Sequence, residues 1–133
     1  MNGRLSTMYA VQIEAYRTAQ NFNMSGRGIE AAALTRCALM LQDCRKNWDA
    51  VGRQEKLTEA LRSNQVIWSV LQSELARDDN PLPLEIRRNL LTLSVFIDKR
   101  IIQIMAHPAP EKLQVLIDIN LNLAAGLRGS PAE

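Results

Sequence analysis

The sequence has few aromatic residues and almost no net charge. Phe, Trp and Tyr make up 5% of its 133 residues, so Leu, Ile and Ala must supply most of any core, which suits helices better than sheets. The formal net charge is +2, whereas a protein that neutralises many phosphates usually carries a larger basic excess. The composition therefore fits a small helical protein and gives no reason to expect nucleic-acid binding.

The sequence is also poor in metal ligands. Cys37 and Cys44 are seven residues apart, which in a helix separates them by about 10 Å, whereas a disulfide needs Cα atoms less than about 7 Å apart. A zinc site would need two more ligands, and the only histidine, His107, stands directly before Pro108. We therefore expect two reduced cysteines packed as small apolar side chains, with no metal and no cofactor.

Long apolar runs and catalytic groupings are missing too. No run approaches the 18 or so apolar residues of a transmembrane helix, and the first twenty residues lack the apolar core of a signal peptide. The lone histidine has no nearby nucleophile, no glycine-rich phosphate loop occurs, and Asp78 and Asp79 sit in a turn-like segment. We expect a cytoplasmic protein without enzymatic activity.

Five stretches instead show the apolar spacing of amphipathic helices, and none alternates as a strand does. Segments rich in glycine or proline separate them. The short connections favour antiparallel neighbours. The sequence thus predicts an all-α fold, a single small bundle of about five helices. The expected helices cover about residues 8–22, 29–51, 54–76, 83–106 and 110–127.

The expected domain organisation is simple. One helical domain covers residues 8–129, preceded by an N-terminal extension or alternative start at 1–7 and followed by a disordered tail at 130–133. The helix expected at 83–106 carries a second apolar face of Leu91, Val95 and Ile102. A helix with two apolar faces can pack against neighbours on both sides, so we expect this helix to be the most central one.

Two predicted helices carry an asparagine within an apolar stripe. Asn64 lies between Leu61 and Trp68, and Asn120 follows Ile117, at spacings of three and four residues. A buried amide without a partner costs roughly 1–3 kcal/mol. Three interpretations remain open: the amides pair and set the helix register, they bond the backbone of a partner at a groove, or they lie on the surface.

Trp68 and the Leu82–Pro83 corner also allow two interpretations each. The indole ring either packs in the core or anchors a partner. The corner either ends one helix and starts the next, or forms the rigid edge of a groove. Val95 belongs to the second apolar face of its helix, which packing against a single neighbouring helix would not bury. The candidate partner-binding residues are Asn64, Trp68, Leu82, Pro83, Val95 and Asn120.

Several segments together resemble the FlaF family of flagellar-biosynthesis proteins from alpha-proteobacteria. The resemblance covers Met8 to Gly129. No single segment is specific, but their order and distances match the family. They are "YAVQIEAYRTAQ", "GRGIEAAALTRCALML", "NQVIW", "DDNPLP", "LEIRRNLLTLSVFI" and "LIDINLNLAAGLRG".

This resemblance implies a cytosolic accessory protein that promotes flagellin production and export as a chaperone binding flagellin. It also implies that the protein counteracts FlbT, a regulator that restrains flagellin translation. Contact between the protein and FlbT would be direct or indirect. The alternative is direct regulation of flagellin messenger RNA. The basic pairs Arg87–Arg88 and Lys99–Arg100 are interleaved with leucines, unlike the aromatic stacking platforms of RNA-binding proteins.

Overall fold

The computed structural model describes residues 24–129, and these residues form helices joined by short turns. No strand occurs within them, so the all-α prediction is confirmed. Within residues 24–129 there are four α-helices, where about five were expected for the whole chain. The helix expected at 8–22, the extension at 1–7 and the tail at 130–133 lie outside the described residues. The elements are α2 (Met24–Lys46), α3 (Arg53–Ala76), α4 (Leu84–Ala106), the 3-10 helix η1 (Pro110–Leu113) and α5 (Gln114–Arg128).

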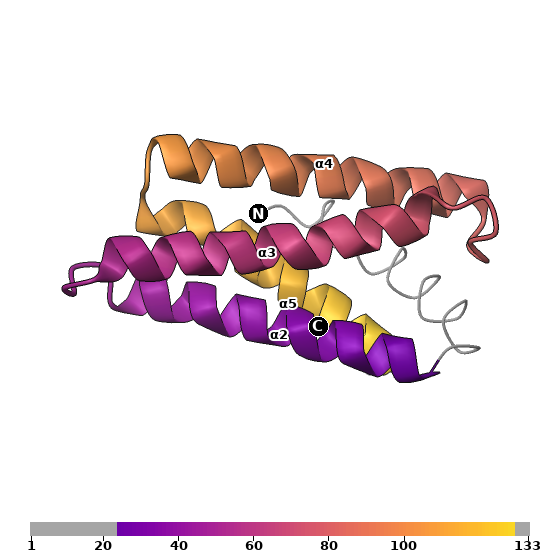
Figure 1. Cartoon of the computed structure of the whole chain (residues 1–133), viewed down its shortest axis with the longest axis horizontal. Helices are drawn as coiled ribbons and strands as arrows, with labels where there is room; N and C mark the ends of the chain where they lie inside the picture. The colour runs from indigo at the N-terminus through magenta and orange to yellow at the C-terminus, as the bar shows by residue number, and fades with distance from the viewer. Residues whose placement is uncertain (1–23, 130–133) are drawn as a thin grey trace.

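The helices α2, α3 and α4 lie side by side and alternate in direction, while α5 passes behind α3 (Figure 1). α2 packs against both α3 and α5, and α4 packs mainly against α3 and η1. This arrangement places the hydrophobic core between the layer of three helices and α5.

The expectation that the fourth predicted helix is the most central is wrong. Eight of the 15 residues of α5 are buried, against five of the 23 residues of α4. α4 lies at the edge of the layer, so Val95 and Ile102 of its second apolar face are exposed, whereas Leu91 packs against the core. The number of apolar residues in α4 therefore does not measure its burial, because some of these residues lie on the surface.

The start of α2 also differs from the prediction. Residues 24–28, expected to be a break because of two glycines and a serine, belong to the helix. A glycine inside a helix costs about 1 kcal/mol relative to alanine. Arg27 of this segment and Glu30, two residues beyond it, are both buried. Tertiary packing of this end therefore outweighs the weak helical propensity of the segment.

The turn between α2 and α3 occupies residues 47–52 and begins earlier than predicted. Gly52 has φ 85° and directly precedes α3. The Arg53 guanidinium lies 4.1 Å from the centre of the Trp48 ring, and its Nε donates to the Trp48 carbonyl oxygen at 3.2 Å. These contacts fix the turn that sets α3 antiparallel to α2.

Cys37 and Cys44 are buried and unpaired with each other, as predicted. Loss of hydration on burial is the largest cause that raises the pKa of both thiols. Above the ordinary thiol pKa of about 8.5, the unfolded chain loses these protons before the folded chain does. The thiols therefore favour folding least at high pH.

We expect the free energy of unfolding to fall as pH rises from about 8 through the raised thiol pKa values. A Cys37→Ala, Cys44→Ala variant should be less stable at pH 7 but should show a shallower fall. Urea denaturation between about pH 7 and 10 measures both slopes. Equal slopes for the two proteins would show that the thiols do not contribute to the pH dependence.

Candidate functional site

A chain of buried hydrogen bonds joins α3 to α5. The Asn120 side-chain Nδ2 donates to Asn64 Oδ1 at 2.6 Å, and Trp68 Nε1 donates to Asn120 Oδ1 at 3.0 Å. Asn64 Nδ2 donates in turn to the Ala60 carbonyl oxygen at 2.9 Å. Both asparagines have an exposed fraction of 0%. Their pairing is therefore confirmed, and the interpretation that they lie on the surface is wrong.

The pairing decides where three of the candidate residues lie. Asn64, Trp68 and Asn120 are in the core, and each polar side-chain atom of the three has a partner. A buried polar group favours folding only when it is bonded, so this network fixes which turn of α5 faces α3. Direct contact of these residues with another protein stays a prediction, and it would require the bundle to open.

The Leu82–Pro83 corner is shaped by Asn80. Its side-chain nitrogen donates to the Glu74 carbonyl oxygen at 2.9 Å, and its side-chain oxygen accepts from the Leu82 backbone N–H at 3.0 Å. Leu82 is buried in the core cluster, whereas Pro83 is exposed and precedes the first residue of α4. The corner thus ends α3 and starts α4, and only Pro83 presents a surface.

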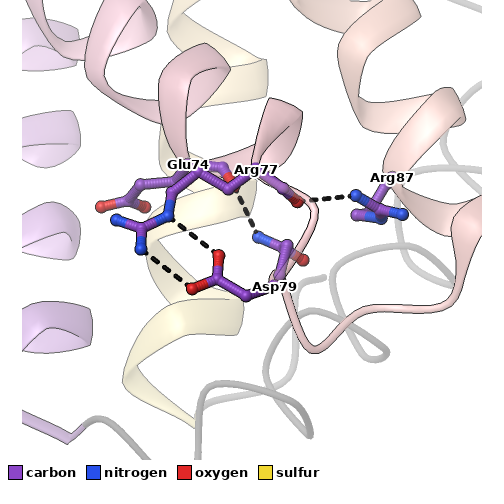
Figure 2. Close-up of polar contacts among 5 residues, drawn as sticks. Glu74, Arg77, Asp79 and Arg87 are labelled. Atoms are coloured by element: carbon purple, nitrogen blue, oxygen red, sulfur yellow. Dashed lines mark hydrogen bonds and ion pairs between the residues drawn. The ribbon is translucent and has the colours of Figure 1, made fainter.

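A second set of contacts braces the same corner (Figure 2). Arg77 donates two hydrogen bonds of 2.9 Å to the carboxylate of Asp79, and this guanidinium lowers the pKa of Asp79. Arg87 of α4 donates to the Arg77 carbonyl oxygen at 2.8 Å. Asp79 is therefore part of the turn, in agreement with the prediction that the two aspartates serve turn chemistry.

Val95 belongs to an exposed apolar strip on α4. Leu84, Leu91, Val95 and Ile102 are spaced by seven, four and seven residues and so share one side of the helix. Leu91 is half-buried, Val95 is 48% exposed and Ile102 is 62% exposed. We call these four residues the α4 apolar face. The prediction of a surplus apolar face is confirmed for Val95 and Ile102 but not for Leu91, which packs against the core.

Polar bonds join α4 to α3 along the flank of the α4 apolar face. Gln72 Nε2 donates to Ser94 Oγ at 3.0 Å and to Asp98 Oδ2 at 2.9 Å. Ser94 Oγ donates in turn to the Leu91 carbonyl oxygen at 2.6 Å. These bonds fix the rotation of α4 about its axis, so the α4 apolar face has a defined orientation.

Sequence reasoning did not find a groove of about 470 Å³ between α2 and α3. Its apolar floor consists of Ala33 and Cys37 of α2 with Val66, Ile67 and Val70 of α3. Polar side chains, including Arg36, Glu55, Glu59 and Arg62, form its rim. The sequence held one signal: Val66 and Val70 stand four residues apart outside the Asn64 stripe.

Within residues 24–129, no cluster of three His, Cys, Asp or Glu side chains is arranged to hold a metal ion. In the same part of the chain, no helix combines the length and the apolar character needed to cross a membrane. What these residues offer instead is a closed core and two apolar surfaces, one on α4 and one between α2 and α3.

The described chain is thus a small helical bundle with apolar surfaces available for contact. Its sequence matches the family described as "Flagellar protein FlaF" over residues 12–127. The chain therefore belongs to the FlaF family of flagellar proteins, as the resemblance indicated. Neither the curated proteins nor the solved structures include a match to this chain.

The amide network predicts an unequal cost for two similar substitutions. Asn120→Leu removes the acceptor of Trp68 and the donor to Asn64, whereas Asn64→Leu leaves only one Asn120 N–H without its acceptor. Each buried group left unsatisfied costs about 1–3 kcal/mol. We therefore expect Asn120→Leu to lower the free energy of unfolding more than Asn64→Leu, as measured by urea denaturation.

The double variant should lose less stability than the sum of the single variants, because the two residues share a bond. Asn89→Leu is the matched control, since Asn89 is exposed on α4, and should change stability by less than about 0.5 kcal/mol. Equal losses for the two single variants would contradict the assigned direction of the bonds.

Proposed function

We propose that this FlaF-family protein is a cytoplasmic accessory protein of flagellum biogenesis that binds flagellin as a chaperone. In this role it promotes flagellin production and export without catalysing a reaction. Family membership supports the flagellar role. The observation that carries the chaperone role is the α4 apolar face, exposed on a helix whose rotation is fixed by Gln72.

The physical requirement of such a chaperone is a stable apolar surface. A flagellin segment held before export exposes an amphipathic stripe, which a partner can cover in the helix-to-groove manner. Val95 and Ile102 lie seven residues apart, about two turns, so they can contact two successive turns of a docked helix. Large exposed apolar side chains in such a row commonly mark interaction sites.

The positions of the core residues favour the surface of α4 over Trp68 as the partner-binding site. The indole ring is buried and its N–H is bonded to Asn120. If Trp68 turned outward to contact a partner, its bond to Asn120 would break. The Asn120 side-chain oxygen would then be left without a hydrogen bond, which would lower the stability of the fold. We therefore assign flagellin binding to the α4 apolar face.

Contact with FlbT, direct or indirect, is compatible with the same role. The alternative function is direct binding of flagellin messenger RNA. Arg88 and Lys99 of α4 are exposed, but the Arg100 guanidinium lies 5.6 Å from the centre of the Phe96 ring. This cation occupies one face of the aromatic ring that a base would need for stacking.

We expect Val95→Asp and Ile102→Asp to weaken flagellin binding by more than tenfold, or about 1.4 kcal/mol. Helical content and melting temperature should stay close to those of the parent protein, because both side chains are exposed. Titration of full-length protein with purified flagellin, alongside circular dichroism, measures both. Val51→Asp is the matched control, since Val51 is fully exposed in the α2–α3 turn.

Trp68→Asp should instead unfold the protein, because it buries an unpaired charge. Normal folding and full flagellin affinity in the Val95 and Ile102 variants would exclude α4 as the binding surface. Flagellin binding should persist after nuclease treatment. If binding is lost with nuclease and falls steeply with salt, the RNA alternative replaces the chaperone proposal.

A further inference from the structure

The groove between α2 and α3 is elongated along α3. From Glu55 to Val70 it follows α3 for about 22 Å, at about 1.5 Å per residue. Its volume of about 470 Å³ is spread along two antiparallel helices. Such an open, elongated shape suits a helix in a groove better than a compact small molecule, which needs most of its surface enclosed.

The charged residues of the groove are ordered along its length. Glu55 and Glu59 lie at the end where α3 begins, and Arg62 follows one turn later on the same helix. Arg36 of α2 also lines the groove. Beyond these residues, Val66 and Val70 form an apolar end. The groove therefore changes from acidic to basic to apolar along α3.

These charges are available to a partner. Within residues 24–129, none of Arg36, Glu55, Glu59 and Arg62 forms an ion pair or a side-chain hydrogen bond. Val66 is 61% exposed although it stands beside the buried Ile67. The groove thus combines an uncovered apolar floor with unpaired charges of both signs at separate positions, which can specify both a partner and its direction.

We propose that this groove binds one amphipathic helix of a partner protein, running parallel to α3. The N-terminus of the bound helix, with its positive dipole end and basic side chains, lies over Glu55 and Glu59. Acidic side chains in its middle pair with Arg36 and Arg62. Apolar side chains in its second half cover Val66 and Val70.

This site shares no residue with the α4 apolar face, so it extends the proposed function rather than restating it. A protein with both surfaces can hold two partners at once. Because the charges are exposed, each ion pair adds little affinity. The apolar end supplies most of the affinity, and the charge order selects the direction of the bound helix.

The test uses the full-length protein and two designed helical peptides of about 18 residues with identical composition. The first carries lysines in its first turn, glutamates in its middle and leucines in its second half. The second has the lysines and glutamates exchanged. Fluorescence anisotropy with labelled peptides should show that the first binds about fivefold more tightly than the second.

Charge reversal in the protein should reverse this preference. In a variant with all four charges exchanged (Glu55→Arg, Glu59→Arg, Arg36→Glu and Arg62→Glu), the second peptide should bind more tightly than the first. Val66→Asp should weaken both peptides by about tenfold or more, because it places a charge against the apolar side chains. The matched controls are Arg88→Glu on α4 and Val51→Asp in the α2–α3 turn, both exposed and outside the groove.

Several outcomes would overturn the proposal. Absence of saturable binding, equal affinity for the two peptides, or an unchanged preference after charge reversal would each do so. Self-association of the free protein that Val66→Asp abolishes would assign the groove to a second copy of the chain. An immobile spin label at Val66→Cys in the free monomer would assign it to a segment of the same chain.

Discussion

The bonded amides of Asn64 and Asn120 determine how this bundle closes. α5 packs chiefly along α2 and has few contacts with α3, so apolar packing alone leaves the pairing of α3 with α5 weakly specified. The Asn120 side chain bonds both Asn64 and Trp68, and no neighbouring turn of α5 can replace it. A register slip would strand three polar groups in the core at roughly 1–3 kcal/mol each. The amides thus give this contact its specificity.

Outside the closed core, two apolar surfaces remain exposed. α4 at the edge keeps Val95 and Ile102 exposed, and α3 contributes two valines to the groove that it forms with α2. Both surfaces lie on helices that polar bonds hold in place, since Gln72 joins α3 to α4 and the Asn64 network joins α3 to α5. Rigid helices with uncovered apolar positions are suited to recognise helical segments of other proteins.

Sequence periodicity predicted much of this fold and part of the site. The seam through Asn64 and Trp68, the matching stripe through Asn120 and the corner at Asn80 are local patterns, and the structure contains all three. Position within the bundle is not local. α4 was expected at the centre because it has two apolar faces. The second face, however, can be exposed to solvent or covered by a partner protein, and does not require a second neighbouring helix. The amphipathic pattern alone does not distinguish these cases.

The groove escaped prediction for a related reason. Val66 and Val70 read as isolated apolar residues on a polar side of α3, and single exposed apolar residues are ordinary. Their meaning appears only when α2 brings Ala33 and Arg36 beside them. The asparagine pairing could be predicted because each of the two helices carries an asparagine within its own apolar stripe. The groove could not, because it is formed only where two helices meet.

The central claim is that the core stays closed while flagellin binds the outer surface of α4. Hydrogen–deuterium exchange of the full-length protein, with and without flagellin, tests it most directly. An edge helix should open locally at low free energy, so bound flagellin should slow exchange across residues 84–106. Exchange around Asn64 and Asn120 should stay slow in both states. Faster exchange at these asparagines on binding, or unchanged exchange along α4, would contradict the account.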